Sequence, residues 1–257
     1  MRDVCFTASG IVALIAINYY IGEYWRGFMK FKAAIFDLDG TLIDSTWVWY
    51  AMMQEFCEEY GIRDELSCLK DTVHMPPTEF VSFIKEKYKL KQSVEEIKNK
   101  IGKTAYKFYS TRVNLKKGVR NLLNLMKENL IEMAIATSCF VELTEVVLKK
   151  CGVYDMFSCF LYSEKLNTNK RSADLYIAAA NQLGFRHEEC AVFEDISIPL
   201  NAVRSCNMGY FGVADERREQ EVKDELKLKA DYYIEDYDEF IENGIFNKFF
   251  NLKGEII

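Results

Sequence analysis

Short runs of apolar residues recur along the chain, and each ends close to polar residues. Continuous apolar runs of this length are typical of strands buried on both faces of a parallel sheet. The stretches between most runs have helical spacing, so we predict a doubly wound parallel α/β sheet. The predicted strands are Ala33–Phe36, Met133–Ala136, Cys159–Tyr162, Ala191–Phe193, Tyr210–Val213 and Tyr232–Ile234. The predicted intervening helices are Val119–Lys127, Glu142–Lys150, Ala173–Leu183, Asn201–Cys206 and Glu219–Lys227.

One interval, residues 45–113, interrupts the alternation of strand and helix. It contains no convincing strand, and its spacing predicts helices at Thr46–Tyr60, Thr78–Lys87 and Val94–Tyr109. We therefore predict an all-helical cap over residues 45–113, inserted into an α/β core formed by residues 29–44 and 114–257. The rest of the article calls residues 45–113 the cap segment.

The first 28 residues form an apolar extension with three possible interpretations. The segment Val4–Gly22 contains no charged residue and is long enough for a marginal membrane span. It nevertheless includes several polar residues. The favoured interpretation is that translation begins at Met29, because this residue leads directly into the first strand. A membrane anchor is the first alternative, with basic residues after it that would keep the rest of the chain in the cytoplasm. The second alternative is an additional soluble helix.

Composition narrows the class of protein. The net charge of −6 argues against nucleic acid as a partner, because phosphate backbones are bound by basic surfaces. The eight cysteines include no C-x-x-C pair and the chain has only two histidines, which argues against a zinc site. Reduced, half-buried thiols in a cytoplasmic protein are the expectation.

Polar side chains follow the first four predicted strands. Because ligands of α/β sheets bind at the carboxyl ends of the strands, these side chains are candidates for one site. Several carboxylates in one crevice repel each other unless a cation lies between them, and hard oxygen ligands suit Mg²⁺. A lysine and hydroxyl groups beside them could hold a phosphate. The candidates are Asp37, Asp39, Thr137, Ser138, Lys170, Glu194 and Asp195.

These residues occur in a recognisable order. The segment Asp37-Leu38-Asp39-Gly40-Thr41 resembles the first motif of the haloacid dehalogenase-like hydrolase superfamily. Thr137 resembles its second motif, Lys170 its third and Glu194-Asp195 its fourth. The order, the spacing and the helical insert are similar to the subgroup of β-phosphoglucomutase and phosphoglycolate phosphatase-like enzymes. The resemblance covers about residues 30 to 240.

The resemblance implies a role for each acid. Asp37 would be the nucleophile and would form an aspartyl-phosphate. Asp39 would protonate the leaving alcohol and then deprotonate the attacking water. Mg²⁺ would be held by the carboxylate of Asp37, the backbone carbonyl of Asp39 and Asp195, with Glu194 close by or in the second shell.

The resemblance also implies how phosphate and substrate would be bound. The Thr137 hydroxyl and the Ser138 backbone N–H would bind phosphate oxygens, and Lys170 would offset the negative charge. The helical cap would close over the substrate and supply specificity. Trp49 and His74 are weak candidates for substrate contacts from the cap. For Trp49, packing within the cap is the favoured interpretation.

We therefore expect a Mg²⁺-dependent phosphatase that acts on a small phosphate monoester, with a sugar phosphate or similar metabolite as substrate. A phosphomutase of the β-phosphoglucomutase type is the first alternative, although no histidine lies between Thr41 and Tyr60 to match the one in that enzyme. Dehalogenase chemistry fits less well, because Asp39 would have no leaving group to protonate. A non-catalytic or membrane-tethered binding protein is the last alternative. The sequence does not indicate the oligomeric state.

Overall fold

The computed structural model describes residues 30–63, 72 and 74–253. The apolar stretch 4–22, and with it the whole extension 1–28, lies outside the described residues. Within the described ranges, no helix combines the length and the apolarity needed to cross a membrane.

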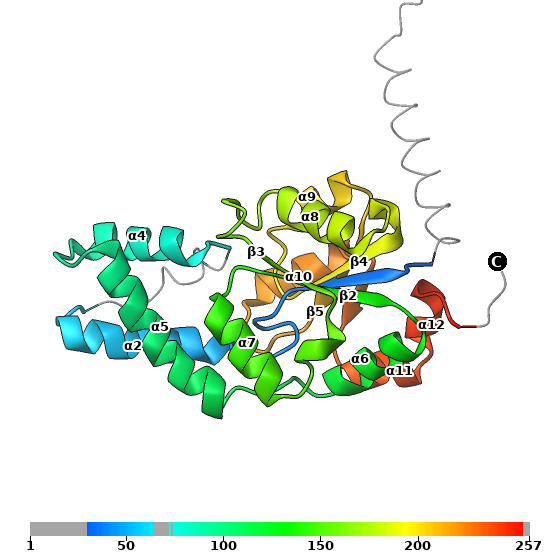
Figure 1. Cartoon of the computed structure of the whole chain (residues 1–257), viewed down its shortest axis with the longest axis horizontal. Helices are drawn as coiled ribbons and strands as arrows, with labels where there is room; N and C mark the ends of the chain where they lie inside the picture. The colour runs from blue at the N-terminus through cyan, green and yellow to red at the C-terminus, as the bar shows by residue number, and fades with distance from the viewer. Residues whose placement is uncertain (1–29, 64–71, 73, 254–257) are drawn as a thin grey trace, which may run out of the picture. The chain divides into compact units, whose positions relative to one another are not determined.

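A six-stranded parallel sheet has the strand order β3-β2-β1-β4-β5-β6. Figure 1 shows the sheet at the centre of the fold with helices around it. All six predicted strands are present, and their ends differ from the predicted ones by at most one residue. The strands are β1 (Ala33–Phe36), β2 (Glu132–Thr137), β3 (Cys159–Tyr162), β4 (Cys190–Glu194), β5 (Gly209–Val213) and β6 (Tyr232–Ile234). The sheet confirms the predicted α/β fold class.

The register of the sheet sets the heights of the strand ends. Phe36 at the end of β1 lies opposite Ile135 of β2 and Phe193 of β4. Asp37, which follows Phe36, is therefore level with the end of β4. The carboxyl ends of β1, β2 and β4 meet at one edge, and this edge carries most of the candidate site residues.

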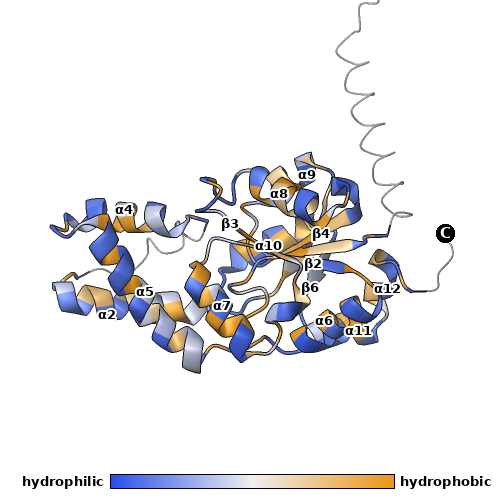
Figure 2. Ribbon diagram, in the orientation of Figure 1, coloured by the Kyte–Doolittle hydropathy of each residue, from blue (hydrophilic) through white to orange (hydrophobic). Residues whose placement is uncertain are grey.

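Both faces of the sheet are covered by helices. Along β1, Ala33 and Ile35 belong to the apolar cluster on one face, whereas Ala34 and Phe36 belong to the cluster on the other. Because successive side chains of a strand point to opposite faces, a strand covered on both sides is apolar throughout, as Figure 2 shows for the central strands. The first cluster includes residues of α8 (Asp174–Leu183), α9 (Leu200–Ser205) and α10 (Gln220–Lys229). The second includes residues of α6 (Val119–Glu128), α7 (Val141–Lys150), α11 (Tyr237–Glu242) and α12 (Ile245–Phe249).

The short helices α11 and α12 were not predicted from the sequence. Each covers fewer than two turns and follows the last strand, so it has neither a clear helical period nor a strand on either side to mark it, as the equally short α9 has. The structure shows what begins α11: the Asp236 carboxylate accepts hydrogen bonds from the backbone N–H groups of Asp238 and Glu239 at 2.8 and 3.2 Å. This is an N-cap, in which a side chain satisfies the first amides of a helix.

The cap segment contains the three predicted helices, now seen as α2 (Thr46–Tyr60), α4 (Pro77–Tyr88) and α5 (Val94–Thr111). The start of α5 is fixed by a capping box, because the Ser93 hydroxyl accepts from the amide of Glu96 and the Glu96 carboxylate accepts from the amide of Ser93. The limits of the cap as a separate domain stay a prediction.

The two chain connections of the cap segment lie side by side. The amide of Asp44 donates to the carbonyl of Asn114 at 3.0 Å, and the amide of Lys116 donates to the carbonyl of Leu42 at 2.9 Å. Ile43 forms an antiparallel bridge with Leu115 between them. The chain thus leaves the sheet and returns to it through one short paired connection.

Candidate active site

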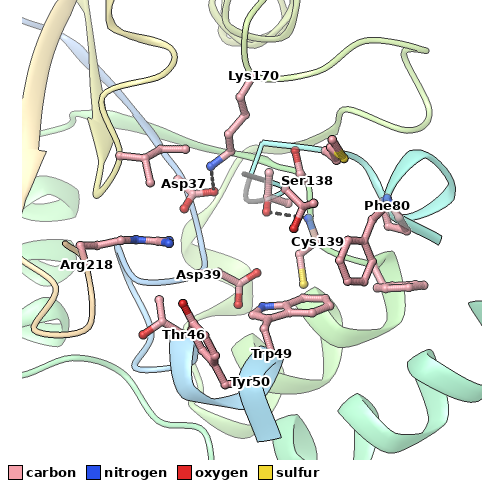
Figure 3. A pocket seen from close by; sticks show the side chains of 16 residues that line it. Asp37, Asp39, Thr46, Trp49, Tyr50, Phe80, Ser138, Cys139, Lys170 and Arg218 are labelled. Carbon is pink, nitrogen blue, oxygen red and sulfur yellow. Dashed lines mark hydrogen bonds and ion pairs between the residues drawn. The ribbon is translucent and has the colours of Figure 1, made fainter. Parts of the chain in front are cut away.

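Asp37 lies at the tip of β1, with a side chain that is buried (Figure 3). Its amide donates to the carbonyl of Phe193 at 3.0 Å, which continues the β1–β4 ladder by one residue. The loop that follows turns at Gly40, where φ is +82° and a Cβ atom would lie 2.3 Å from Asp195 Oδ2. Only glycine fits such a left-handed position beside a carboxylate, so Gly40 lets the β1 and β4 loops approach each other.

Lys170 lies between two buried carboxylates. Its Nζ atom is 2.6 Å from Asp37 Oδ1 and 2.9 Å from Glu194 Oε1. Burial disfavours the ammonium, but Asp37 and Glu194 outweigh this effect and raise the pKa of Lys170. The hydroxyl of Tyr176 donates to Glu194 Oε1 at 2.9 Å, so both the lysine and a phenol hold this side chain.

The carboxylates of this cluster exceed its lysine in number. Burial raises the pKa of Asp37 to about 6, and the negative charges of Asp195 and Asp39 act in the same direction against Lys170. Burial likewise raises the pKa of Glu194 to about 8, with Asp37 and Asp195 adding to the shift. Such shifts mark a site that lacks positive charge, which a bound cation would supply.

Asp195 is buried and hydrogen-bonded through both carboxylate oxygens. Thr41 Oγ1 donates to Oδ1 at 3.2 Å, and Arg218 Nε donates to Oδ2 at 2.5 Å. Arg218 follows β5, and its loop is held by Asp215, which accepts from the backbone N–H of Arg217 at 2.9 Å. The fifth strand end therefore contributes a cation to the site.

Asp39 is held by two hydroxyl groups that come from different parts of the chain. Ser45 Oγ donates to Asp39 Oδ1 at 2.5 Å, and the hydroxyl of Tyr109 donates to the same oxygen. Tyr109 belongs to α5 of the cap segment and is fully buried. The cap segment thus reaches the carboxylate that follows the candidate nucleophile.

Thr137 and Ser138 lie at the end of β2, as predicted. The backbone N–H of Cys139 donates to Thr137 Oγ1 at 3.0 Å, so the hydroxyl hydrogen of Thr137 can point elsewhere. Ser138 Oγ is engaged differently: it is 3.0 Å from the hydroxyl of Ser163 and donates to the carbonyl of His74 at 3.4 Å. The side chain of Ser138 is thus used within the chain.

The two weak candidates of the cap segment, Trp49 and His74, differ in their position relative to the site. Trp49 lines a cavity together with Asp37, Asp39, Thr137, Ser138 and Lys170. It also packs, since its ring lies near those of Phe80 and Phe140. His74 is buried, and its side chain does not line this cavity.

The acidic cluster fits a divalent cation. Carboxylate oxygens of Asp37, Glu194 and Asp195 lie within 4.8 Å of one another, and all three side chains are buried. Hard oxygen donors at this spacing are the ligands that Mg²⁺ prefers. All three carboxylates also have partners within the chain, since Glu194 accepts from Lys170 and Tyr176, Asp195 accepts from Thr41 and Arg218, and Asp37 pairs with Lys170.

The sequence interpretation missed Arg218 and Tyr109. Arg218 could have been found by applying to the fifth strand the rule that was applied to the first four, since it follows the end of β5 by a few residues. No comparable signal pointed to Tyr109. A tyrosine on the apolar stripe of an amphipathic helix is expected to pack, and its hydroxyl reaches Asp39 only through the tertiary fold.

Comparisons with known proteins agree with this geometry. Residues 34–213 match the model of the haloacid dehalogenase-like hydrolase family. A phosphorylated carbohydrates phosphatase of Thermotoga maritima is 23% identical over 69% of this chain and 82% of its own length. A probable pseudouridine-5'-phosphatase of Drosophila melanogaster is 26% identical over 75% of this chain and 85% of its own. The crystal structure of β-phosphoglucomutase from Clostridium difficile superposes with a TM-score of 0.70 at 20% identity, covering 85% of this chain and 96% of that one.

The chain belongs to the haloacid dehalogenase-like hydrolase family. Its similarity lies with the β-phosphoglucomutase and phosphoglycolate phosphatase-like members, as the sequence motifs indicated.

Proposed function

We propose that this chain hydrolyses small phosphate monoesters with the help of Mg²⁺ and through an aspartyl-phosphate on Asp37. The general class, a phosphoric monoester hydrolase, is shown by the family match together with the phosphatases among its relatives. One observation carries the finer proposal: Lys170 Nζ lies 2.6 Å from Asp37 Oδ1, inside a buried acidic cluster beside a second aspartate.

The first step is attack by Asp37 on the phosphorus atom. A carboxylate must be ionised to attack, and a pKa of about 6 leaves Asp37 mainly ionised above neutral pH. The bond between phosphorus and the ester oxygen breaks, and Asp39 gives its proton to that oxygen as the alcohol leaves. Ser45 and Tyr109 hold the Asp39 carboxylate in place through hydrogen bonds.

The second step is hydrolysis of the aspartyl-phosphate. Asp39, now ionised, takes a proton from a water molecule, which attacks phosphorus and releases inorganic phosphate from Asp37. The Thr137 hydroxyl and the Ser138 backbone N–H would bind phosphate oxygens in both steps, and Lys170 would offset charge on Asp37 and the phosphate.

Mg²⁺ would be held by the carboxylates of Asp37 and Asp195 and by the backbone carbonyl of Asp39, with Glu194 beside them. When bound, the ion would neutralise part of the negative charge of the phosphoryl group and the carboxylates. The remaining assignment, the alcohol part of the substrate, is left open by the relatives, because one is named for phosphorylated carbohydrates and another for pseudouridine-5'-phosphatase activity.

The proposal is tested by measuring phosphate release from p-nitrophenyl phosphate by the full chain, with Mg²⁺ and with EDTA. We expect Mg²⁺-dependent turnover that is lost in Asp37→Asn, and a phosphorylated Asp37 detected by mass spectrometry after acid quenching. Full activity of Asp37→Asn would contradict the proposed nucleophile. Conversion of a sugar phosphate to its isomer without phosphate release would support a phosphomutase instead.

A further inference from the structure

The cavity beside Asp39 has one charged end and one apolar wall. Asp37, Lys170 and Arg218 line the charged end, where the phosphate would be bound. The opposite wall is formed by described residues of the cap segment and of the loop before α7: Trp49, Met75, Pro77, Phe80 and Phe140. Asp39 lies between the two, with the indole of Trp49 close to it (Figure 3).

The three aromatic rings of the wall come from three different elements. Trp49 belongs to α2 and Phe80 to α4, whereas Phe140 directly precedes α7. The rings of Trp49 and Phe140 are nearly parallel, at 17° with centroids 6.4 Å apart, and the ring of Phe80 is nearly perpendicular to Trp49, at 80° and 6.2 Å. Aromatic rings attract one another at these centroid distances. An aromatic ring of a bound substrate could therefore pack against these three side chains with favourable geometry.

A sugar would find few partners on the same wall. The Thr46 hydroxyl already donates to Asp215 at 3.2 Å. Among the described residues that line the cavity away from its charged end, the other hydroxyl groups are those of Tyr50 and Thr72. A hexose phosphate would place several hydroxyl groups against carbon, and a buried hydroxyl without a hydrogen bond costs free energy. An aromatic ring packed against this wall would instead remove from water both its own apolar surface and that of the wall.

We propose that the substrate is a phosphate monoester whose alcohol part carries a planar aromatic ring. This inference rests on the proposed function of the same site. It places the phosphorus atom at Asp37, the ester oxygen at Asp39 and the ring against Trp49, Phe80 and Phe140. Two kinds of compound share this chemistry: simple arylmethyl phosphates, and nucleoside monophosphates in which a sugar separates the ring from the phosphate.

The test compares kcat/KM of the full chain with Mg²⁺ for benzyl phosphate, uridine 5'-monophosphate and glucose 6-phosphate, by phosphate release. We expect at least one ring-bearing ester to be preferred to glucose 6-phosphate by tenfold or more. A preference for benzyl phosphate alone would indicate a ring directly at the ester, and a preference for the nucleotide would indicate a ring beyond a sugar. Equal or better hydrolysis of glucose 6-phosphate would overturn the inference.

Two tryptophans of α2 provide a matched pair of variants. Trp49→Leu should reduce the preference for the ring-bearing ester over glucose 6-phosphate about tenfold. Trp47→Leu should leave the preference unchanged, because Trp47 packs on Phe108 and does not line the cavity. An unchanged preference in a folded Trp49→Leu would contradict the assignment. Should this variant fail to fold, Phe140→Leu tests the same wall.

Binding separates a failure of this inference from a failure of the proposed function. Isothermal titration of the full-length Asp37→Asn variant with benzylphosphonate and with glucose 6-phosphate reports ring preference without turnover, with the same tenfold difference expected. Absence of hydrolysis together with tighter binding of benzylphosphonate would contradict only the proposed activity. Hydrolysis that depends on Asp37 without any ring preference would contradict only the inference about the ring.

Discussion

Arg218 Nε donates to Asp195 Oδ2 at 2.5 Å, and one oxygen of the same Asp195 carboxylate lies within 4.8 Å of an oxygen of Asp37 and of Glu194. The guanidinium therefore supplies positive charge to the same carboxylate that would bind Mg²⁺. Both partners are mostly buried, with side-chain exposures of 18% for Arg218 and 1% for Asp195. The two cations are thus expected to share the task of neutralising Asp195.

This relationship predicts a different response to Mg²⁺ when the arginine is removed. Arg218→Gln should lower the melting temperature in EDTA, because breaking a buried pair leaves a carboxylate without compensation, at a cost on the order of 3 kcal/mol. Saturating Mg²⁺ should then raise the melting temperature of the variant more than that of the unchanged chain. Differential scanning fluorimetry measures both shifts. Arg218→Lys, which keeps the charge, is the control, and an equal Mg²⁺ response in all three proteins would contradict the prediction.

The buried carboxylates predict an unusual dependence of stability on pH. Between the ordinary pKa of 3.8 and the folded value of about 6, native Asp37 holds a proton that the unfolded chain has released. Unfolding in this range releases protons, so the contribution of Asp37 to stability falls as the pH rises from about 4 to 6. In EDTA, Asp37→Asn should therefore gain in melting temperature relative to the unchanged chain across this range, on the order of 5 °C. A difference that stays constant with pH would show that the folded pKa is not raised.

Tyr109 is expected to position the proton-donating aspartate. In Tyr109→Phe, Asp39 loses one of its two hydroxyl donors, so proton transfer to the leaving alcohol should weaken about tenfold in kcat, with KM little changed. The loss should appear with alkyl phosphates and be small with p-nitrophenyl phosphate, whose leaving group needs no proton. Steady-state kinetics on both substrates provide the measurement.

A second tyrosine of the same helix serves as the control for this variant. Tyr106 lies on α5 like Tyr109 but is 46% exposed. Tyr106→Phe should leave both substrates unaffected. Equal losses of Tyr109→Phe on the alkyl and the aryl ester would indicate general damage to the fold rather than a positioning role.

Gly40 should tolerate no side chain. Its φ of +82° disfavours any other residue, and an added Cβ would also meet Asp195 Oδ2 at 2.3 Å. Gly40→Ala should therefore abolish phosphate release and weaken Mg²⁺ binding, as measured by isothermal titration. Gly184 has a similar φ of +80° with no atom within 4 Å of an added Cβ. Gly184→Ala should cost only about 1 kcal/mol of stability and keep full activity. Retained activity in Gly40→Ala would contradict the close approach of the two loops.

The fold could be predicted in detail from the sequence because strands that are buried on both faces of a sheet form recognisable apolar runs. Every strand of the sheet contains an uninterrupted apolar run, and no tertiary information is needed to recognise that run. The position of Asp37 at a strand tip follows from the same pattern, because a carboxylate that ends such a run must lie at the sheet edge. The strands therefore also located the candidate nucleophile.

Other features depend on contacts that no local pattern records. The hydroxyl of Tyr109 reaches Asp39 across 70 positions of sequence, and Arg218 reaches Asp195 across 23. Trp49 illustrates a different difficulty, since the sequence offered packing and substrate contact as alternatives, whereas its ring both packs and lines the cavity. The helical period places a side chain on a face but does not say what lies opposite it.

The paired connection between Ile43 and Leu115 brings the two ends of the cap segment together where the chain leaves the sheet and returns to it. Because the two ends of the cap segment are neighbours in space, a different inserted segment could connect the same two points without shifting the strands of the sheet. Evolution of a new specificity in such a chain needs no change at Asp37 or Lys170. Trp49 and Phe80 of the proposed substrate wall thus lie in the cap segment, whereas Asp37 and Lys170 of the proposed chemistry lie outside it.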